Sequence, residues 1–158
     1  MTKKKSPVIS FEDFSFQYRA QKKPTLTGIN LNIYPGEKVL IAGPSGSGKS
    51  TLAGCINGLN PFSNPGESTG KLIVDGVDAM QSSIFELSAH VGTVLQDPDG
   101  QFIGLTVGED IAFALENSCT PQDKMHEITK HAAELVGIEH HLDLSLIHIS
   151  EPTRPISI

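Results

Sequence analysis

The pattern of apolar and polar residues predicts strands in the first two thirds of the chain. Apolar residues alternate with polar ones over residues 14–18 and again over residues 29–33, which is typical of half-buried strands. Residues 39–42 form a continuous apolar run, and this predicts a strand covered on both faces. Residues 72–74 and 91–95 predict two further strands.

Helical patterns lie between and after these strands. Leu52, Cys55, Ile56 and Leu59 recur at helical spacing, and Gly58 and Pro61 are expected to stop that helix. Thr106 to Glu109 reads as a capping box that opens a second helix. Thr120 followed by Pro121 predicts the start of a third helix, which ends before Gly137. This order predicts an α/β domain with an antiparallel β layer at its N-terminal end.

Composition excludes two classes of protein. No run in the 158 residues approaches the roughly 18 apolar residues of a membrane span. A net charge of −6 argues against a nucleic-acid partner, which would need a basic face. Residues 72–123 contain no Lys or Arg but several acidic residues. This stretch is either a solvated acidic face or a docking surface for a basic partner.

A glycine-rich loop supplies the main candidate chemistry. Gly43 to Ser50 fits the pattern G-x-x-x-x-G-K-[ST], between an apolar run and a helical pattern. The glycines allow backbone N–H groups to converge on phosphates, and the helix N-terminus adds positive charge. Lys49 would bind the β- and γ-phosphates, and the Ser50 hydroxyl would ligate Mg²⁺. The loop therefore predicts a nucleoside triphosphate with Mg²⁺ as ligands.

Further motifs resemble the nucleotide-binding domain of ABC transporters. They are Phe14–Tyr18, Gly36–Lys38, the loop Gly43–Thr51 and the strand-like segment Val91–Pro98. The resemblance implies ATP as the nucleotide, a P-loop NTPase fold with a RecA-like parallel core, and two ATPase subunits that pair head to tail. It implies that Tyr18 stacks on adenine and that Gln96, at the Q-loop position, reaches Mg²⁺ or the attacking water. The expected nucleotide-binding residues are Tyr18, Gly43, Pro44, Ser45, Gly46, Ser47, Gly48, Lys49, Ser50 and Thr51.

Two segments narrow the resemblance within this family. Gln96–Phe102 and Thr106–Asn117 look like the ATPase subunits of energy-coupling-factor (ECF) importers, which take up cobalt, nickel and vitamins. This implies that a transmembrane subunit docks near Gln96–Asn117. It also implies a peripheral place on the cytoplasmic face of the membrane.

Other family motifs do not occur in the printed sequence. It contains no LSGGQ-type signature, no apolar run ending in Asp-Glu and no switch histidine after such a run. Residues 144–158 resemble a translated sequencing adaptor, so we expect residues 1–143 to be the N-terminal part of an ATP-binding domain that is incomplete at its C-terminus. Such a chain would bind ATP without hydrolysing it. A small-molecule P-loop kinase and a non-catalytic regulatory nucleotide-binding module are the alternatives.

Overall fold

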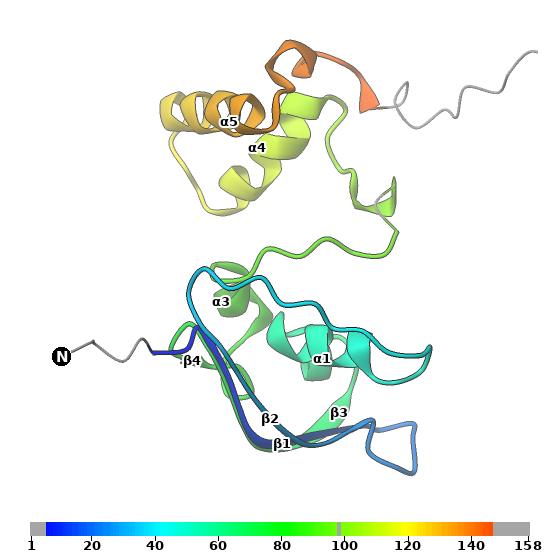
Figure 1. The fold of residues 1–158 in the computed structure, drawn as a ribbon. Coiled ribbons are helices and arrows are strands. Elements are labelled where there is room, and N and C mark those ends of the chain that lie inside the picture. The colour runs from blue at the N-terminus through cyan, green and yellow to red at the C-terminus, as the bar shows by residue number, and fades with distance from the viewer. Residues whose placement is uncertain (1–5, 98, 147–158) are drawn as a thin grey trace, which may run out of the picture. The chain divides into compact units, whose positions relative to one another are not determined.

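The computed structural model describes residues 6–97 and 99–146. The described part of the chain forms two compact units, the first up to Thr93 and the second from Val94 (Figure 1). The expected adaptor-like segment lies mostly outside the described residues, because residues 147–158 are not among them.

The first unit contains an antiparallel sheet of four strands. In chain order these are β1 (Ile9–Tyr18), β2 (Leu26–Ile33), β3 (Gly66–Val74) and β4 (Val77–Asp78), and they lie in the order β2-β1-β3-β4. The strands predicted over residues 14–18, 29–33 and 72–74 are therefore confirmed, as is the antiparallel layer. β3 begins at Gly66 and is therefore longer than predicted. The prediction was too short because the Pro, Gly and Ser residues before residue 72 favour a loop.

A β-bulge in β1 brings three phenylalanines onto one face of the sheet. The pairing of β1 with β2 shifts between Phe11 and Phe14, and its pairing with β3 shifts between Glu12 and Ser15. The extra residue resets the alternation, so Phe11, Phe14 and Phe16 are all buried although their spacing is uneven. Asp13 lies in the bulge with φ 45°.

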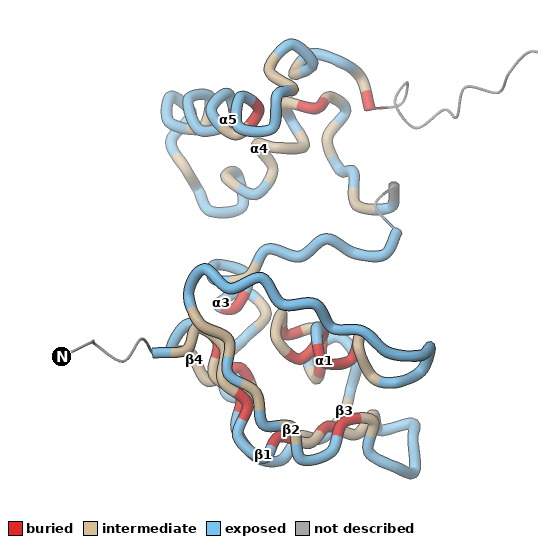
Figure 2. The backbone as a smooth tube through the Cα atoms, in the orientation of Figure 1, coloured by how far each residue is buried: buried red, intermediate tan, exposed pale blue. Residues whose placement is uncertain are grey.

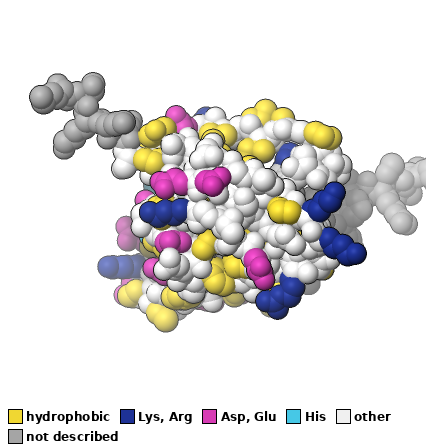
Figure 3. All heavy atoms as spheres, turned by 90° about the horizontal axis from the view of Figure 1, so that it is seen from below, with side chains coloured by type: hydrophobic (Ala, Val, Ile, Leu, Met, Phe, Trp, Pro, Cys, Tyr) yellow, Lys and Arg dark blue, Asp and Glu magenta, His cyan; other side chains and the backbone are white. Residues whose placement is uncertain are grey.

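Helix α1 (Lys49–Ile56) covers the apolar face of this sheet (Figure 1). Leu52 and Cys55 of α1 join the phenylalanines in one core cluster, which also takes in Leu87 of α3 (Ile84–Ser88). The short helix α2 (Leu59–Phe62) follows α1 directly. In Figure 2 the buried segments of the first unit lie on the strands and on parts of α1 and α3. Figure 3, seen from below, shows acidic and basic side chains with hydrophobic ones interspersed.

The apolar runs at residues 39–42 and 91–95 are not strands in this structure, so these two predictions are wrong at the level of local structure. Within residues 6–97 and 99–146, no strand pairs with either run. Leu40 is 89% exposed and Val94 is 87% exposed. A strand requires a neighbour for its backbone N–H and C=O groups, and apolar side chains alone do not supply one.

The second unit is helical. It contains η1 (Asp99–Gln101), α4 (Val107–Asn117), α5 (Gln122–Val136) and η2 (Glu139–His141). The predicted capping box is present, because the Thr106 hydroxyl accepts from the Glu109 N–H and the Glu109 carboxylate accepts from the Thr106 N–H. α5 begins one residue later than predicted, with Pro121 at its N-cap and without a side-chain cap from Thr120. Gly137 ends α5 in a left-handed conformation, as predicted.

Leu144, Ser145 and Leu146 connect to the segment that precedes α4. The Val107 N–H donates to the Leu144 carbonyl at 3.1 Å, and the Leu146 N–H donates to the Leu105 carbonyl at 3.0 Å. Ser145 forms an isolated antiparallel bridge with Thr106. None of the helices in the described ranges has the length and apolar character that a membrane crossing requires.

We predict that Gly70→Ala strongly destabilises the first unit. Gly70 has φ 79°, and a Cβ there would collide with the backbone carbonyl of Asp13 in the bulge. The expected loss in free energy of unfolding is about 3 kcal/mol, from backbone strain plus overpacking. Gly76→Ala is the matched control, since Gly76 has φ 84° but open space around it, and strain alone costs about 1 kcal/mol. Equal losses in urea unfolding followed by circular dichroism would contradict the role of the bulge.

Candidate functional site

The glycine-rich loop leads directly into α1, as the sequence predicts. Gly48 is the N-cap of α1 and has φ 90°, and Gly46 has φ 77°. A Cβ on Gly48 would lie 3.0 Å from Leu26 Cδ2 and 3.2 Å from the Thr25 carbonyl oxygen. Glycine is thus required at position 48 both by its backbone conformation and by its contact with the start of β2.

The Lys49 ammonium lies within this loop. Its Nζ donates to the Gly43 carbonyl at 2.9 Å and to the Pro44 carbonyl at 2.7 Å, and it lies 3.5 Å from Ser47 Oγ. Ser45, Gly46, Ser47 and Ser50 are exposed. The loop therefore presents a positive charge, a hydroxyl and the first N–H groups of a helix on an open surface. Because those N–H groups have no acceptor within the helix, the arrangement suits an anion such as a phosphate.

The residues also fit the Mg²⁺ that accompanies a nucleoside triphosphate. No group of three or more His, Cys, Asp or Glu side chains suited to a metal ion occurs among the described residues. Mg²⁺ at phosphate sites is usually held by phosphate oxygens, water and only one or two protein groups. The exposed Ser50 hydroxyl, in the first turn of α1, is a group of that kind.

The structure brings Tyr18 and Thr51 together, although they are 33 residues apart. The Tyr18 hydroxyl donates to Thr51 Oγ1 at 3.1 Å. The Tyr18 ring packs edge-on against Phe16, with centroids 5.0 Å apart and planes at 90°. The aromatic residue that ends β1 is thereby tied to the helix that starts at the glycine-rich loop.

Asn60 is a residue of this site that the sequence analysis did not single out. Its side chain is fully buried and donates from Nδ2 to the Tyr18 hydroxyl at 3.2 Å and to the Thr51 carbonyl at 3.1 Å. Asn64 donates to its Oδ1 at 3.0 Å. The only signal in the sequence is one polar residue between the apolar Leu59 and Phe62, and that signal is too weak to mark a buried position.

Cys55 lies on the buried side of α1 and also hydrogen bonds with the Asn60 side chain. Burial raises the pKa of the Cys55 thiol to about 12, and the hydrogen bond from Asn60 opposes this rise in part. The thiol is therefore a packing group of the core and not a nucleophile at neutral pH.

Gln96 belongs to the second unit, where it lies exposed at a bend. Lys49 and Ser50 belong to the first unit. The predicted role of Gln96 at Mg²⁺ remains an expectation from the resemblance.

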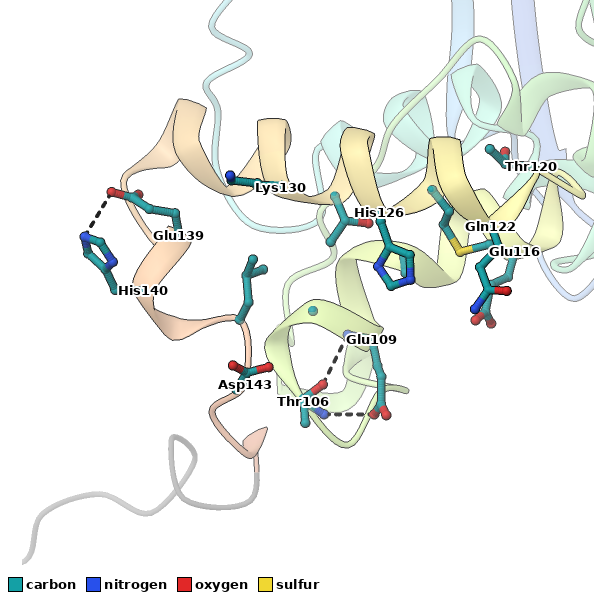
Figure 4. Close-up of a pocket in the computed structure, with 15 residues that line it drawn as sticks. Thr106, Glu109, Glu116, Thr120, Gln122, His126, Lys130, Glu139, His140 and Asp143 are labelled. Carbon is teal, nitrogen blue, oxygen red and sulfur yellow. Dashed lines mark hydrogen bonds and ion pairs between the residues drawn. The ribbon is translucent and has the colours of Figure 1, made fainter.

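The second unit contains a groove of about 1000 Å³ between α4 and α5, closed at one end by the segment around η2 (Figure 4). None of the residues predicted to bind nucleotide line this groove. Its lining carries four carboxylates, from Glu109, Glu116, Glu139 and Asp143. The side-chain oxygens Thr129 Oγ1 and Glu139 Oε2 are buried without a hydrogen-bond partner.

The carboxylates of two acidic residues of α4 accept hydrogen bonds from backbone N–H groups. Asp110 Oδ1 accepts from the N–H groups of Ile103 and Gly104, at 2.9 and 3.2 Å. Glu109 Oε2 accepts from Leu105 and Thr106, at 2.9 and 3.1 Å. These carboxylates hold the turn before α4, so the negative charge of residues 72–123 is not all available to a partner.

Comparison with known proteins identifies the family. The sequence profile of the ABC transporter family matches residues 26–153. The chain belongs to the ABC transporter family. A protein of Clostridium perfringens is 58% identical over 143 residues, which are 90% of this chain and 25% of that protein. A Bacillus thuringiensis protein is 60% identical over 132 residues, which are 84% of this chain and 23% of the relative. Both names provisionally describe ABC transporter ATP-binding proteins.

A solved structure supports the same fold. The cbiO1 protein of Clostridium perfringens, described as part of the ABC transporter complex cbiONQ, matches with a TM-score of 0.74 and 31% sequence identity. The match covers 89% of this chain and 54% of the cbiO1 chain. The chain spans about a quarter of the length of the curated relatives it matches. The ABC ATPase fold expected from the sequence is thus confirmed, and the described strands are its antiparallel layer.

We predict that the two cysteines differ sharply in reactivity. Cys119 is exposed, whereas Cys55 is buried with a pKa of about 12 against an ordinary 9.0. At pH 8 this lowers the thiolate fraction of Cys55 about a thousandfold. Ellman's reagent should therefore modify one thiol rapidly in the native chain and the second only in urea. Cys119→Ser is the control and should abolish the rapid phase. Rapid reaction of both thiols would show that α1 does not pack as described.

The raised pKa of the Cys55 thiol also links this residue to stability at alkaline pH. Because the folded pKa lies above the unfolded one, the stabilising effect is complete below about pH 9 and is lost as pH rises towards about 12.

Proposed function

We propose that the first unit binds ATP with Mg²⁺. The observation that carries this proposal is the Lys49 ammonium, held inside a glycine-rich loop at the N-terminus of α1. A cation, orphan N–H groups and an exposed hydroxyl meet there, and a triphosphate with its metal requires all three. Membership of the ABC family supports ATP as the nucleotide.

Each residue has a definite task in this proposal. Gly43, Pro44, Ser45, Gly46, Ser47 and Gly48 form the loop whose backbone N–H groups meet the phosphates. Lys49 neutralises phosphate charge, Ser50 ligates Mg²⁺, and Thr51 lies next to Tyr18, whose ring stacks on adenine. The metal supplies charge neutralisation on the phosphate oxygens when bound. Gln96 would have the Q-loop role that the family resemblance implies, which is to reach Mg²⁺ or the attacking water.

We further propose that the chain serves an ECF-type importer of a micronutrient. The cbiO1 neighbour, part of a cbiONQ complex, supports this assignment. The chain would act on the cytoplasmic face of the membrane as a peripheral subunit, paired with a second ATPase subunit. Residues 1–143 would be the N-terminal part of the ATP-binding domain and residues 144–158 a non-native tail. The 158-residue chain would bind ATP without turning it over.

Residues Gln96–Asn117 would contact the transmembrane subunit. Three large apolar side chains in the described part of this segment are exposed, those of Phe102, Ile103 and Leu105. Glu116 is exposed on α4 and lines the groove of the second unit. Apolar side chains beside an acidic one suit a partner helix that carries basic residues. Substituting Asp110 or Glu109 would also break their hydrogen bonds to backbone N–H groups, so Glu116 is the better probe of this surface.

The proposed nucleotide site predicts how the full chain binds ATP. Lys49→Ala should weaken Mg²⁺-dependent ATP binding at least about tenfold, since a charge-assisted contact to phosphate is lost. Lys71→Ala, which removes an exposed charge on β3, is the control and should leave affinity unchanged. Isothermal titration calorimetry measures the affinity, and a phosphate-release assay should stay at background. An ATP affinity that is the same in Lys49→Ala and in the unchanged chain would refute the proposed site.

The proposed docking surface predicts the effect of a charge reversal at Glu116. Glu116→Lys should reduce co-purification with the co-expressed transmembrane subunits about fivefold or more, because like charges would then meet across the interface. Glu127→Lys makes the same change of charge on the exposed part of α5, outside Gln96–Asn117, and is the matched control. ATP affinity should be the same in both variants. Equal recovery of Glu116→Lys and the unchanged chain would refute docking at this surface.

A further inference from the structure

Asn60 occupies an unusual position for a polar side chain. Its side chain is 1% exposed. It lies in α2 of the first unit, where the backbone dihedral angles of Asn60 itself are not helical. Burying an amide is costly unless its donors and acceptor are satisfied. Here both the amide donors and the amide oxygen have partners within the protein.

Besides the Cys55 thiol, Asn60 Nδ2 has two partners, and both are residues of the proposed nucleotide site. One hydrogen bond ends on the Tyr18 hydroxyl and the other on the backbone carbonyl of Thr51. The Tyr18 hydroxyl in turn donates to Thr51 Oγ1. Asn60, Tyr18 and Thr51 therefore form a closed triangle of hydrogen bonds, in which the tyrosine hydroxyl both accepts and donates.

The close packing around Asn60 fixes its place. A Cβ on Gly54 would lie 2.5 Å from Asn60 Nδ2, so the helix backbone approaches the amide directly. Asn64 holds the amide oxygen from the other side. These contacts orient the two N–H groups towards Tyr18 and Thr51, and they leave the amide one arrangement that satisfies all its partners.

We infer that Asn60 is a positioning residue that sets the distance between the aromatic ring of Tyr18 and the phosphate-binding end of α1. The inference rests on the proposed function, in which Tyr18 stacks on the base and the loop before Thr51 holds the phosphates. A nucleotide has a limited span between base and phosphates, so a ring fixed relative to α1 is prepared for stacking. Asn60 touches neither the base nor the phosphates and acts through Tyr18.

The test compares two ligands in the full chain, ATP and inorganic tripolyphosphate. Tripolyphosphate uses the loop but offers no base. Asn60→Leu should weaken ATP binding about tenfold, because part of the stacking energy between the base and the Tyr18 ring is lost. It should leave tripolyphosphate binding within about a factor of two. Asn32→Leu makes the same change of residue on β2, where the exposed Asn32 side chain accepts a hydrogen bond from Ser10, and it should affect neither ligand beyond that range.

A double substitution identifies the route of the effect. Tyr18→Phe removes the hydroxyl but keeps the ring, so it should reproduce the loss of ATP affinity, and adding Asn60→Leu should then cause little further loss. If Asn60→Leu does not fold, Tyr18→Phe alone decides, because unchanged ATP affinity in that variant would overturn the inference.

The remaining outcomes are also decisive. Equal weakening of ATP and tripolyphosphate by Asn60→Leu would assign Asn60 to the general structure of the loop and overturn the inference. An unchanged chain that binds neither ligand would instead refute the proposed function itself.

Discussion

The packing of α1 on the phenylalanines of β1 is the contact on which the first unit depends. Phe11, Phe14 and Phe16 present one apolar face, and Leu52 and Cys55 of α1 cover it. The bulge at Asp13 makes this face possible, because without the extra residue Phe11 would point away from Phe14 and Phe16. The start of α1 is therefore fixed relative to the sheet, and with it the loop that carries Lys49.

The same packing connects the sheet to the polar end of the site. Tyr18 continues β1 beyond the phenylalanines and reaches Thr51 on the helix. The buried Asn60 side chain also joins β1 to α1, because it donates hydrogen bonds to the Tyr18 hydroxyl and to the Thr51 carbonyl. An apolar core sets the distance between two layers but does not fix the rotation of a ring at its edge. In this unit the hydrogen bonds of the Tyr18 hydroxyl fix that rotation, because hydrogen bonds are directional.

Local patterns predicted those features whose causes are local. The glycine-rich loop, the capping box at Thr106 and the helix end at Gly137 each depend on a few neighbouring residues, and the structure contains all three. Asn60 could not be predicted in this way, because its partners Tyr18 and Thr51 come from other elements. The apolar run at residues 39–42 shows the opposite error. Its composition is that of a buried strand, but pairing depends on a neighbour that the pattern itself does not provide.

Counting charges likewise overstated what the acidic stretch offers to a partner. Asp110 and Glu109 each bind two backbone N–H groups just before α4, so their charge serves to shape the chain. A carboxylate that caps a turn is already partly neutralised by those donors, and moving it towards a basic partner would cost those bonds. Electrostatic attraction by this unit therefore depends on the carboxylates that bind no backbone. Glu116, which opens onto the groove between α4 and α5, is placed to act in this way.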